Sequence, residues 1–396
     1  MKPLEGVTVL ALEHAIAAPL CTRHLADQGA RVIKVERPGA GDFARGYDER
    51  VRGLASHFVW TNRSKESLTL DLKHPDAPQV LARLLARCDV LVQNLAPGAS
   101  ARLGLSYGNL AQQHPRLIVC DISGYGDDPA NPGPYRDRKA YDLLIQSESG
   151  FVSVTGSPEE PAKASCSIAN IAAGMYAYSN VLAALIERGR TGRGKRIDVS
   201  MLQAAVSWLV AVLPLLDMDA EPAEVTRNGN AHRRFVPTNV YPTRDGFLYI
   251  ALGSNAQWQR LVALPRYKTL AARPDWATAE GRYRDRLDIY RMLGAATVTG
   301  TLAEVAADFA AIKVPHTEIN TVAAAAALEA IRRRLNQTTL PDGRVVRLPP
   351  SAVDLPTLPK SFAPPPRYAE HTRAILAEAG LGAREIDGLF ASGAVA

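Results

Sequence analysis

The first 200 residues alternate between short apolar runs of strand length and longer stretches with helical spacing. Residues 7–12 predict a strand, residues 18–30 a helix with Pro19 in its first turn and Gly29 suited to end it, and residues 31–36 the next strand. Two strands joined by a helix in this way form a right-handed crossover and lie parallel in one sheet. The chain is therefore predicted to begin as an α/β fold.

The same unit recurs further along the chain. Val80, Leu81, Leu84 and Leu85 stand at helical spacing between two strand-like runs. The other predicted elements are strands at residues 67–72, 90–95, 117–122 and 197–201 and helices at residues 75–87, 170–188 and 202–216. The repetition predicts a parallel sheet.

Changes of pattern predict the domain boundaries. Asp245-Gly246 and Asp342-Gly343 are hairpin signals, and the second precedes a proline-rich segment at residues 348–366. The last 30 residues predict two short amphipathic helices. We predict a large domain at residues 1–220, a small domain at residues 221–330, and a linker with C-terminal helices at residues 331–396 that returns to the large domain.

Charge and cysteine spacing narrow the class of protein. The net charge of +6 is spread along the chain without a basic run interleaved with aromatic residues. An anionic small ligand is therefore expected rather than nucleic acid. The four cysteines have neither disulfide nor metal spacing, and the first apolar stretch is of strand length and is interrupted by Glu13. We expect a cytoplasmic protein without a signal peptide or membrane span at this end.

Common cofactor motifs do not explain the charge. No G-x-G-x-x-G follows a strand, which argues against a dinucleotide fold. Residues 189–195 spell G-x-x-x-x-G-K, but Arg196 follows where a P-loop needs Ser or Thr. The pairs at residues 13–14 and 370–371 combine a glutamate and a histidine without a third ligand at metal spacing. No metal site is predicted.

Several segments in chain order resemble the class III coenzyme A transferase family of the CaiB/BaiF type. The first is the opening strand–helix–strand stretch with its K-x-E-R-P-G-x-G-D turn at residues 34–42. The others are NRSKESLTLDLK at 62–73, DVLVQNLAPGASARLGL at 89–105, SGYG at 123–126, RKAYDLLIQSESG at 138–150, TGRGKRIDVSM at 191–201 and the C-terminal helices. Each piece alone is moderately specific, whereas their shared order is highly specific.

This resemblance implies a Rossmann-like parallel-sheet large domain formed by both chain ends, a smaller α+β domain, and an interlocked homodimer. It also implies an acyl-CoA substrate, bound where open α/β sheets place their ligands, at the carboxyl ends of the strands. Arginine and lysine suit the phosphates of coenzyme A. The positions that match the family's coenzyme A groove are Arg37, Leu70, Lys73, Asn94, Leu95, Arg102, Lys139, Tyr141 and Met201.

Family members are understood to use an aspartate as covalent nucleophile, in a pattern like A-D-x-x-x-G-M. Here residues 169–175 read ANIAAGM, so the position is Asn170. A carboxamide has no anionic oxygen, and we hypothesise that Asn170 is an engineered replacement that impairs the covalent cycle, with a naturally inactive relative as the alternative. The resemblance also places Asp142 near the active site and Gly253 and Ser254 in a mobile active-site loop, with a helix cap and a plain turn as the structural alternatives.

Residues 41–60 resemble the branch that acts on small dicarboxylic acids such as mesaconate, itaconate, citramalate and succinate. Ile16 stands where the oxalate branch has a glutamine, which argues against formyl-CoA:oxalate exchange. Tyr141 stands where the racemases have a histidine base, which argues against α-methylacyl-CoA racemisation. The residues predicted to lie at the acid are His14, Ile16, Arg45 and Arg52, although solvated surface arginines are an equal alternative. We predict transfer of coenzyme A from succinyl-CoA to such an acid. An acyl-CoA racemase or isomerase and a non-catalytic coenzyme A-binding protein are the alternatives.

Overall fold

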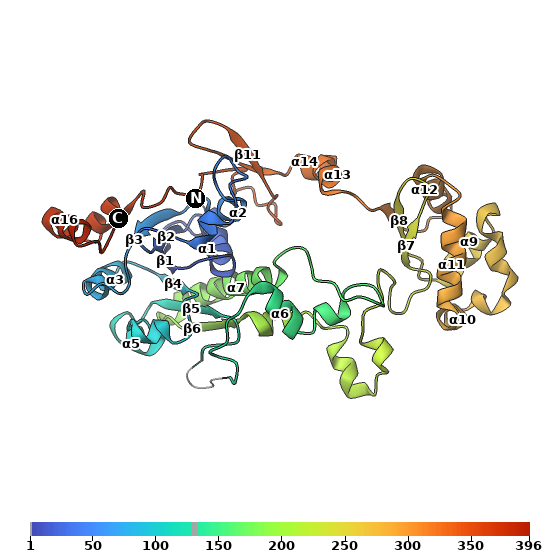
Figure 1. Ribbon diagram of the computed structural model, residues 1–396, viewed down its shortest axis with the longest axis horizontal. Helices are drawn as coiled ribbons and strands as arrows, with labels where there is room; N and C mark the ends of the chain where they lie inside the picture. The colour runs from blue at the N-terminus through green and yellow to red at the C-terminus, as the bar shows by residue number, and fades with distance from the viewer. Residues whose placement is uncertain (1, 129–132) are drawn as a thin grey trace. The chain divides into compact units, whose positions relative to one another are not determined.

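The computed structural model describes residues 2–128 and 133–396, which form two compact units (Figure 1). The first unit combines residues 1–151, 164–209 and 333–396, and the second combines residues 152–163 and 210–332. The sequence analysis placed the boundaries at residues 220 and 330. The assignment of residues 152–163 to the second unit was not anticipated.

The first unit contains a six-stranded sheet in the order β3-β2-β1-β4-β5-β6 with every pairing parallel. This is the strand order of doubly wound nucleotide-binding folds, so the α/β prediction is confirmed. The strands are β1 (Thr8–Leu12), β2 (Arg31–Glu36), β3 (Glu66–Thr69), β4 (Val90–Gln93), β5 (Ile118–Ser123) and β6 (Arg196–Ser200).

Successive side chains of a strand point to opposite faces of the sheet. Because both sets are apolar here, helices cover both faces. Val9 and Ala11 belong to one hydrophobic cluster, and Leu10 and Leu12 belong to the other. The first cluster is completed by α1 (Ala17–Asp27), α6 (Asp142–Glu148), α7 (Ile168–Thr191) and α8 (Met201–Val206). The second is completed by α3 (Ala77–Leu85), α5 (Tyr107–Gln113), α15 (Thr372–Glu378) and α16 (Ala383–Ala391).

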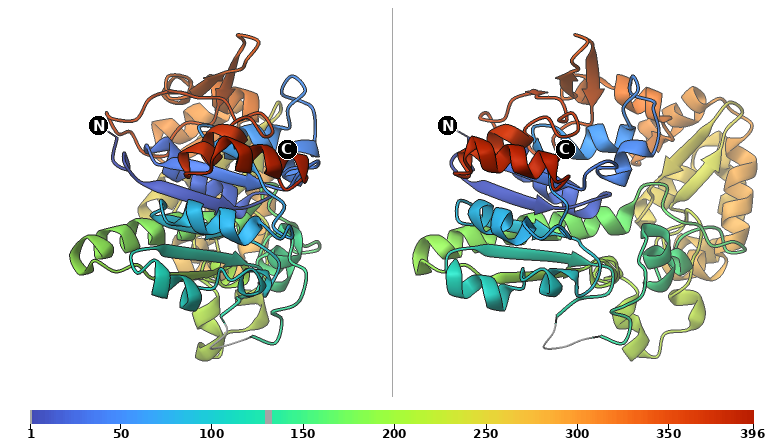
Figure 2. Two further views of the ribbon diagram at one scale, coloured as in Figure 1. Left: turned by 90° about the vertical axis from the view of Figure 1, so that its left-hand side faces the viewer. Right: turned by 60° about the vertical axis from the view of Figure 1, so that its left-hand side comes forward.

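Both chain ends contribute to this unit. The C-terminal helices, red in Figure 2, lie beside the blue N-terminal strands. The backbone N–H of Thr69 in β3 donates to Oγ1 of Thr372 at 3.1 Å. The return of the C-terminal segment to the sheet is therefore visible in specific contacts.

The long helix α7 owes its position to small residues. A Cβ on Gly174 would lie 2.7 Å from the carbonyl oxygen of Ala17, so only glycine lets α7 approach α1 this closely. By length and composition alone, α7 could cross a membrane, a test that core helices of soluble proteins also pass. In this structure, α7 packs against α1, α6, α8 and the sheet.

One predicted helix is shorter than expected. The apolar run at residues 202–216 was predicted to be a single helix, but α8 ends at Val206 and a separate 3-10 helix, η3, covers Leu213–Met218. Pro214 lies in the first turn of η3, where proline is tolerated, and its ring and missing N–H oppose a continuous helix. Apolar composition therefore did not decide the length of this helix.

Both predicted hairpins are confirmed. In the first unit, β10 (Asn336–Thr339) and β11 (Val345–Leu348) pair antiparallel around Gly343, whose φ is +82°, and β12 (Ser361–Phe362) pairs with β10. In the second unit, β7 (Asn239–Pro242) and β8 (Phe247–Ile250) pair antiparallel around Asp245-Gly246. The remaining elements of the first unit are η1 (Phe43–Gly46), α2 (Ser56–Asn62) and α4 (Ala99–Arg102).

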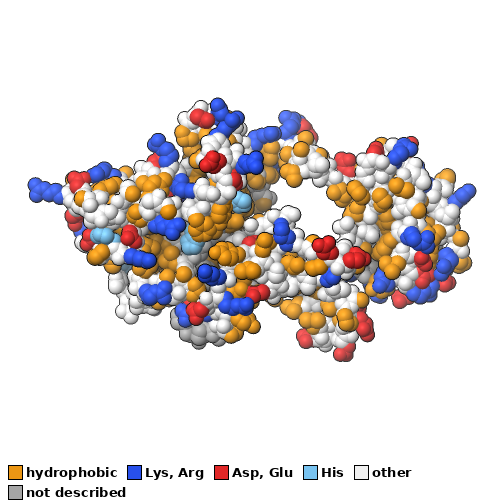
Figure 3. Space-filling model, viewed as in Figure 1, with side chains coloured by type: hydrophobic (Ala, Val, Ile, Leu, Met, Phe, Trp, Pro, Cys, Tyr) orange, Lys and Arg blue, Asp and Glu red, His pale blue; other side chains and the backbone are white. Residues whose placement is uncertain are grey.

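The second unit packs β7, β8 and β9 (His316–Glu318) with helices around its own aromatic core. Trp258, Trp276 and Tyr241 are almost fully buried there. Its main helices are α9 (Asn255–Val262), α10 (Ala279–Arg284), α11 (Arg286–Thr297), α12 (Leu302–Ala311), α13 (Val322–Ala327) and α14 (Glu329–Arg332). On the face drawn in Figure 3, basic and acidic side chains are interspersed over the described residues.

Candidate active site

A cavity of about 620 Å³ lies at the carboxyl ends of β1, β2 and β3. Parallel strands end at the same edge of a sheet, so the loops that follow them share one hollow. The lining residues that the sequence analysis named are His14, Arg37, Leu70, Lys73 and Leu95. The structure therefore brings together five of the predicted residues from four separate segments.

The loop after β1 is held in an unusual conformation. The side chain of Asn94 makes two hydrogen bonds with the backbone of His14: its Oδ1 accepts from the His14 N–H at 3.0 Å, and its Nδ2 donates to the His14 carbonyl at 2.9 Å. The next residue, Ala15, has a φ of +63°, which is rare for a residue with a Cβ. Ile16 is buried at the start of α1. Asn94 thus acts on the cavity through His14.

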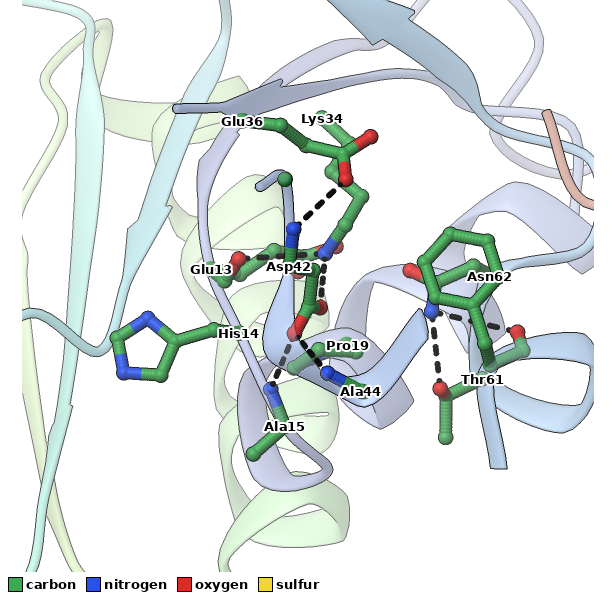
Figure 4. A network of polar contacts seen from close by, with 12 residues as sticks. Glu13, His14, Ala15, Pro19, Lys34, Glu36, Asp42, Ala44, Thr61 and Asn62 are labelled. Carbon is green, nitrogen blue, oxygen red and sulfur yellow. Dashed lines mark hydrogen bonds and ion pairs between the residues drawn. The ribbon is translucent and has the colours of Figure 1, made fainter. Parts of the chain in front are cut away.

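A buried charge network lies beneath this loop (Figure 4). Nζ of Lys34 lies 2.8 Å from Oδ2 of Asp42 and 3.5 Å from Oε1 of Glu13, and Nζ of Lys65 lies 2.6 Å from the same Glu13 oxygen. The side chains of Lys34, Lys65, Glu13 and Asp42 are fully buried. Two ammonium groups and two carboxylates balance in charge, which a buried site requires.

Burial also shifts the protonation of neighbouring groups. Desolvation lowers the pKa of Lys65 to about 8, although Glu13 acts in the opposite direction. Desolvation also lowers the pKa of His14, so its imidazole is held in the neutral form. In Figure 4, the His14 ring points away from Lys34 and Asp42, whose charged groups face each other. The ring of Phe43, which also lines the cavity, lies 5.2 Å from that of His14.

The two arginines predicted to bind a substrate carboxylate lie in different surroundings. Arg45 donates to both carboxylate oxygens of Glu36 at 2.8 and 2.7 Å, donates to the Pro366 carbonyl, and lies 3.9 Å from the centre of the Phe58 ring. These contacts give Arg45 a structural role, and its assignment as a substrate ligand stays a prediction. Arg52 is exposed in a tight turn with a φ of +56°.

The remaining predicted coenzyme A residues do not line the cavity. Arg102 and Lys139 are exposed, and Tyr141 is 65% exposed at the start of α6. Met201 is buried in the first hydrophobic cluster at the start of α8. A role for these four positions in binding coenzyme A stays a prediction.

Asn170 lies in the first turn of α7, where Asp142 of α6 holds it. Oδ1 of Asp142 accepts from both the backbone N–H of Asn170 at 2.9 Å and its Nδ2 at 3.2 Å. Asp142 therefore caps α7, an anion at a helix N-terminus, rather than its own helix. Asn170 is half-buried, whereas its neighbours Ala169 and Ala172 are fully buried. Its side chain thus lies outside the packed core.

Gln146 fixes the other side of Asp142. Its Nε2 donates to Oδ2 of Asp142 at 2.6 Å, and its Oε1 accepts from the backbone N–H of Ala164 at 3.0 Å. Gln146 is fully buried, so its amide links α6 to the segment that leads into α7. Sequence reasoning missed this residue, because a single glutamine in an amphipathic helix gives no signal.

Gly253 and Ser254 lie in the second unit. Ser254 is the N-cap of α9 and forms a reciprocal capping box with Gln257, whose Oε1 also accepts from the N–H of Gly253 at 3.0 Å. The local contacts therefore explain this pair as a helix start. Their assignment to an active-site loop stays a prediction.

Comparisons with known proteins agree on one family. The chain matches the profile described as CoA-transferase family III over residues 4–372. It is 33% identical over 387 residues to the succinyl-CoA:glutarate CoA-transferase of Mus musculus, covering 96% of this chain and 86% of that protein. It is 32% identical over 304 residues to the succinyl-CoA–D-citramalate CoA-transferase of Chloroflexus aurantiacus, covering 76% and 74%. A solved CaiB/BaiF family protein from Brucella suis has a TM-score of 0.83 at 32% identity, covering 96% of this chain and 99% of that chain.

Proposed function

The chain belongs to CoA-transferase family III, as its motifs predicted, and on this premise we propose that it transfers coenzyme A from succinyl-CoA to a short dicarboxylic acid. The two relatives are named for succinyl-CoA together with glutarate or D-citramalate. Both of these acids carry two carboxyl groups on a five-carbon skeleton. Glutarate therefore joins mesaconate, itaconate and citramalate as a candidate acceptor.

The cavity at the carboxyl ends of β1, β2 and β3 is the observation that carries this proposal. Coenzyme A has anionic phosphates at one end and an uncharged pantetheine arm at the other. The cavity offers Arg37 and Lys73 for the phosphates and Leu70 and Leu95 as apolar wall for the arm. Its volume of about 620 Å³ is within the range of ligand sites.

We propose that the covalent chemistry belongs to residue 170. An aspartate there would attack the thioester carbonyl, forming a C–O bond while the C–S bond breaks and coenzyme A leaves as thiolate. The thiolate would then attack the aspartyl carbonyl, which releases the donor acid and leaves coenzyme A bound to the enzyme as a thioester. The acceptor acid would reverse both steps. The carboxamide of Asn170 has no anionic oxygen for the first attack, so this chain is proposed to be impaired.

The decisive experiment restores the carboxylate. The Asn170→Asp variant should gain turnover of on the order of 10³-fold or more, given that loss of a covalent nucleophile costs up to about 10⁶. Turnover is measured with succinyl-CoA and a panel of glutarate, D-citramalate, itaconate and mesaconate, and mass spectrometry then searches for coenzyme A on residue 170. Asn170→Ala is the matched control and should show neither turnover nor adduct.

The alternatives have distinct outcomes in the same experiment. Binding of succinyl-CoA without turnover or adduct in Asn170→Asp would support a non-catalytic coenzyme A-binding protein. Exchange of the C2 proton of a 2-methylacyl-CoA without transfer would support a racemase. Either result would refute the transferase proposal.

We also propose an interlocked homodimer in the cytoplasm. A second hollow of about 500 Å³ runs along β6, which stands at the end of the sheet order, and is flanked by α7 and α8. Tyr176 in its lining is exposed and accepts a hydrogen bond from the exposed Trp208, and Met175 and Ile186 are further exposed apolar side chains of α7. The free thiols of all four cysteines suit a reducing compartment. Light scattering should give twice the chain mass of 42.7 kDa.

A further inference from the structure

Two cavity-lining segments meet on a single carboxylate. Oδ1 of Asp42 accepts from the backbone N–H of Ala15 at 3.2 Å and from that of Ala44 at 2.9 Å (Figure 4). Ala15 belongs to the loop that carries His14, and Ala44 belongs to η1, which carries Phe43. One oxygen atom therefore sets the spacing between the two segments whose rings, His14 and Phe43, line the cavity.

The loop needs such an anchor. With a φ of +63°, Ala15 occupies the left-handed region that residues with a Cβ avoid. This conformation costs free energy, so the loop would leave it unless contacts hold it in place. Those contacts are the two Asn94 bonds on His14 and the Asp42 bond on Ala15. The loop is thus fixed at His14 by Asn94, which directly follows β4, and at Ala15 by Asp42.

The anchor is itself held by charge. Oδ2 of Asp42 faces Nζ of Lys34 at 2.8 Å, and the same ammonium donates to the Glu13 carbonyl at 3.2 Å. Lys34 of β2 therefore contacts both Asp42 and Glu13, the residue that precedes His14 in the loop. A buried network of this kind usually contributes little net stability compared with apolar side chains of similar volume. Its conformational effect on the cavity loops is the role that the geometry supports.

We propose that Asp42 is a positioning residue that, braced by Lys34, holds His14 and Phe43 in the geometry that binds the acyl-CoA. This inference rests on the proposed function, because it assigns the cavity to that substrate. It predicts that the acceptor oxygen at residue 42, rather than its charge, determines affinity. Charge is needed only because Lys34 lies opposite.

Two double variants separate the acceptor from the charge. Lys34→Met/Asp42→Asn removes both charges but keeps an oxygen that accepts from Ala15 and Ala44. Lys34→Met/Asp42→Val removes both charges and the acceptor at similar volume. Isothermal titration with succinyl-CoA should show affinity within about threefold of the parent for the first and at least about tenfold weaker binding for the second, the size expected for losing buried hydrogen bonds.

A second pair of variants avoids the buried network. Ala15→Gly favours the left-handed backbone and should keep the parent affinity, whereas Ala15→Val disfavours it and should bind about tenfold more weakly. Residue 15 is only partly buried, so both variants should fold. This pair decides the question if Lys34→Met/Asp42→Val does not fold.

Amide hydrogen exchange of residues 13–17 separates failure of this inference from failure of the proposed function. Faster exchange in Lys34→Met/Asp42→Val and Ala15→Val than in their partners, together with weaker binding, supports the positioning role. Equal affinity and equal exchange within each pair would overturn it. If the parent does not bind succinyl-CoA at all, the function proposal fails, and the exchange comparison still decides whether Asp42 holds the loop.

Discussion

Asp42 and Asp142 are bonded in the same pattern but lie in opposite surroundings. The Oδ1 atom of each carboxylate accepts two hydrogen bonds, and the Oδ2 atom faces a third donor. The third donor is the ammonium of Lys34 for Asp42 and the neutral amide of Gln146 for Asp142. Asp42 is buried, whereas Asp142 is half-exposed. The first carboxylate is therefore locked into a balanced network, and the second depends on the chemistry of residue 170.

Removing the counter-ion of the buried aspartate should have the largest effect on stability. Lys34→Met leaves the Asp42 carboxylate buried and unpaired, which typically costs about 3–5 kcal/mol. The free energy of unfolding from urea titration measures this loss. Lys195→Met is the control, because Lys195 pairs with Glu187 on the surface, where such pairs contribute about 0–1 kcal/mol. Similar losses in both variants would show that the buried Asp42–Lys34 pair contributes no more to stability than a surface pair.

The Glu36–Arg45 pair should give a distinct acid response. Burial alone would raise the pKa of Glu36, but hydrogen bonds from Arg45, the charges of Lys34 and Arg45, and a hydrogen bond from the Asp42 N–H together lower it to about 2 from its usual 4.5. A carboxyl with a depressed pKa stabilises the fold above pH 4.5, and this contribution is lost as the pH falls toward 2. Lowering the pH from 5 to 2 should therefore shrink the stability difference between the parent and Arg45→Met by up to roughly 3 kcal/mol, since Lys34 and the Asp42 N–H supply part of the shift in both proteins.

The affinity of the Arg45→Met variant for succinyl-CoA tests whether Arg45 only supports Glu36 or also binds the substrate carboxylate. If Arg45 only supports Glu36, the dissociation constant for succinyl-CoA should change less than about threefold while the protein stays folded. A selective loss of succinyl-CoA binding without the acid response would instead support Arg45 as a ligand of the substrate carboxylate.

The amide that supports Asp142 should have a smaller effect. Gln146→Met keeps the volume but removes the donor to Asp142 and the acceptor for Ala164, so a loss of about 1–3 kcal/mol in unfolding free energy is expected. Gln79→Met on the exposed side of α3 is the control and should stay within about 0.5 kcal/mol of the parent. Equal effects would mean that the Gln146 amide does not hold the start of α7.

Local patterns predicted most of the fold of the first unit. Period-two and helical spacing predicted the strands of the parallel sheet, and Asp342-Gly343 predicted the hairpin of this unit, as Asp245-Gly246 did for the hairpin of the second unit. The same patterns could not assign residues 152–163 to the second unit, because that depends on contacts between distant segments. They also extended the helix at residues 202–216 too far, since apolar composition outweighed Pro214.

The candidate site was predicted only in part. The family resemblance, together with the rule that ligands bind at the carboxyl ends of parallel strands, predicted Arg37, Lys73 and His14, which line one cavity. The network beneath them was missed because its partners come from separate strands and loops. Lys34 carried a usable signal, since a lysine within an apolar strand of a doubly covered sheet requires a buried anion. Arg45 carried no such signal, because nothing in the sequence around it indicated its ion pair with Glu36.

The smallest effect should appear at the half-exposed aspartate, Asp142, and it should depend on pH. Asn170→Asp replaces the donor to Asp142 with a second carboxyl and should cost about 1 kcal/mol near pH 7. The introduced carboxyl has a like charge opposite, so its folded pKa should be raised, and its contribution to stability is present at low pH and lost as the pH rises through that value. Urea titration at pH 4.5 and 7.5 should therefore show the variant closer to the parent at pH 4.5, whereas Asn170→Ala should show one cost at both. If the cost of Asn170→Asp did not change with pH, the two side chains would not face each other as described. The expected result means that the substitution proposed to restore turnover also strains the start of α7, so that stability and activity oppose each other at residue 170.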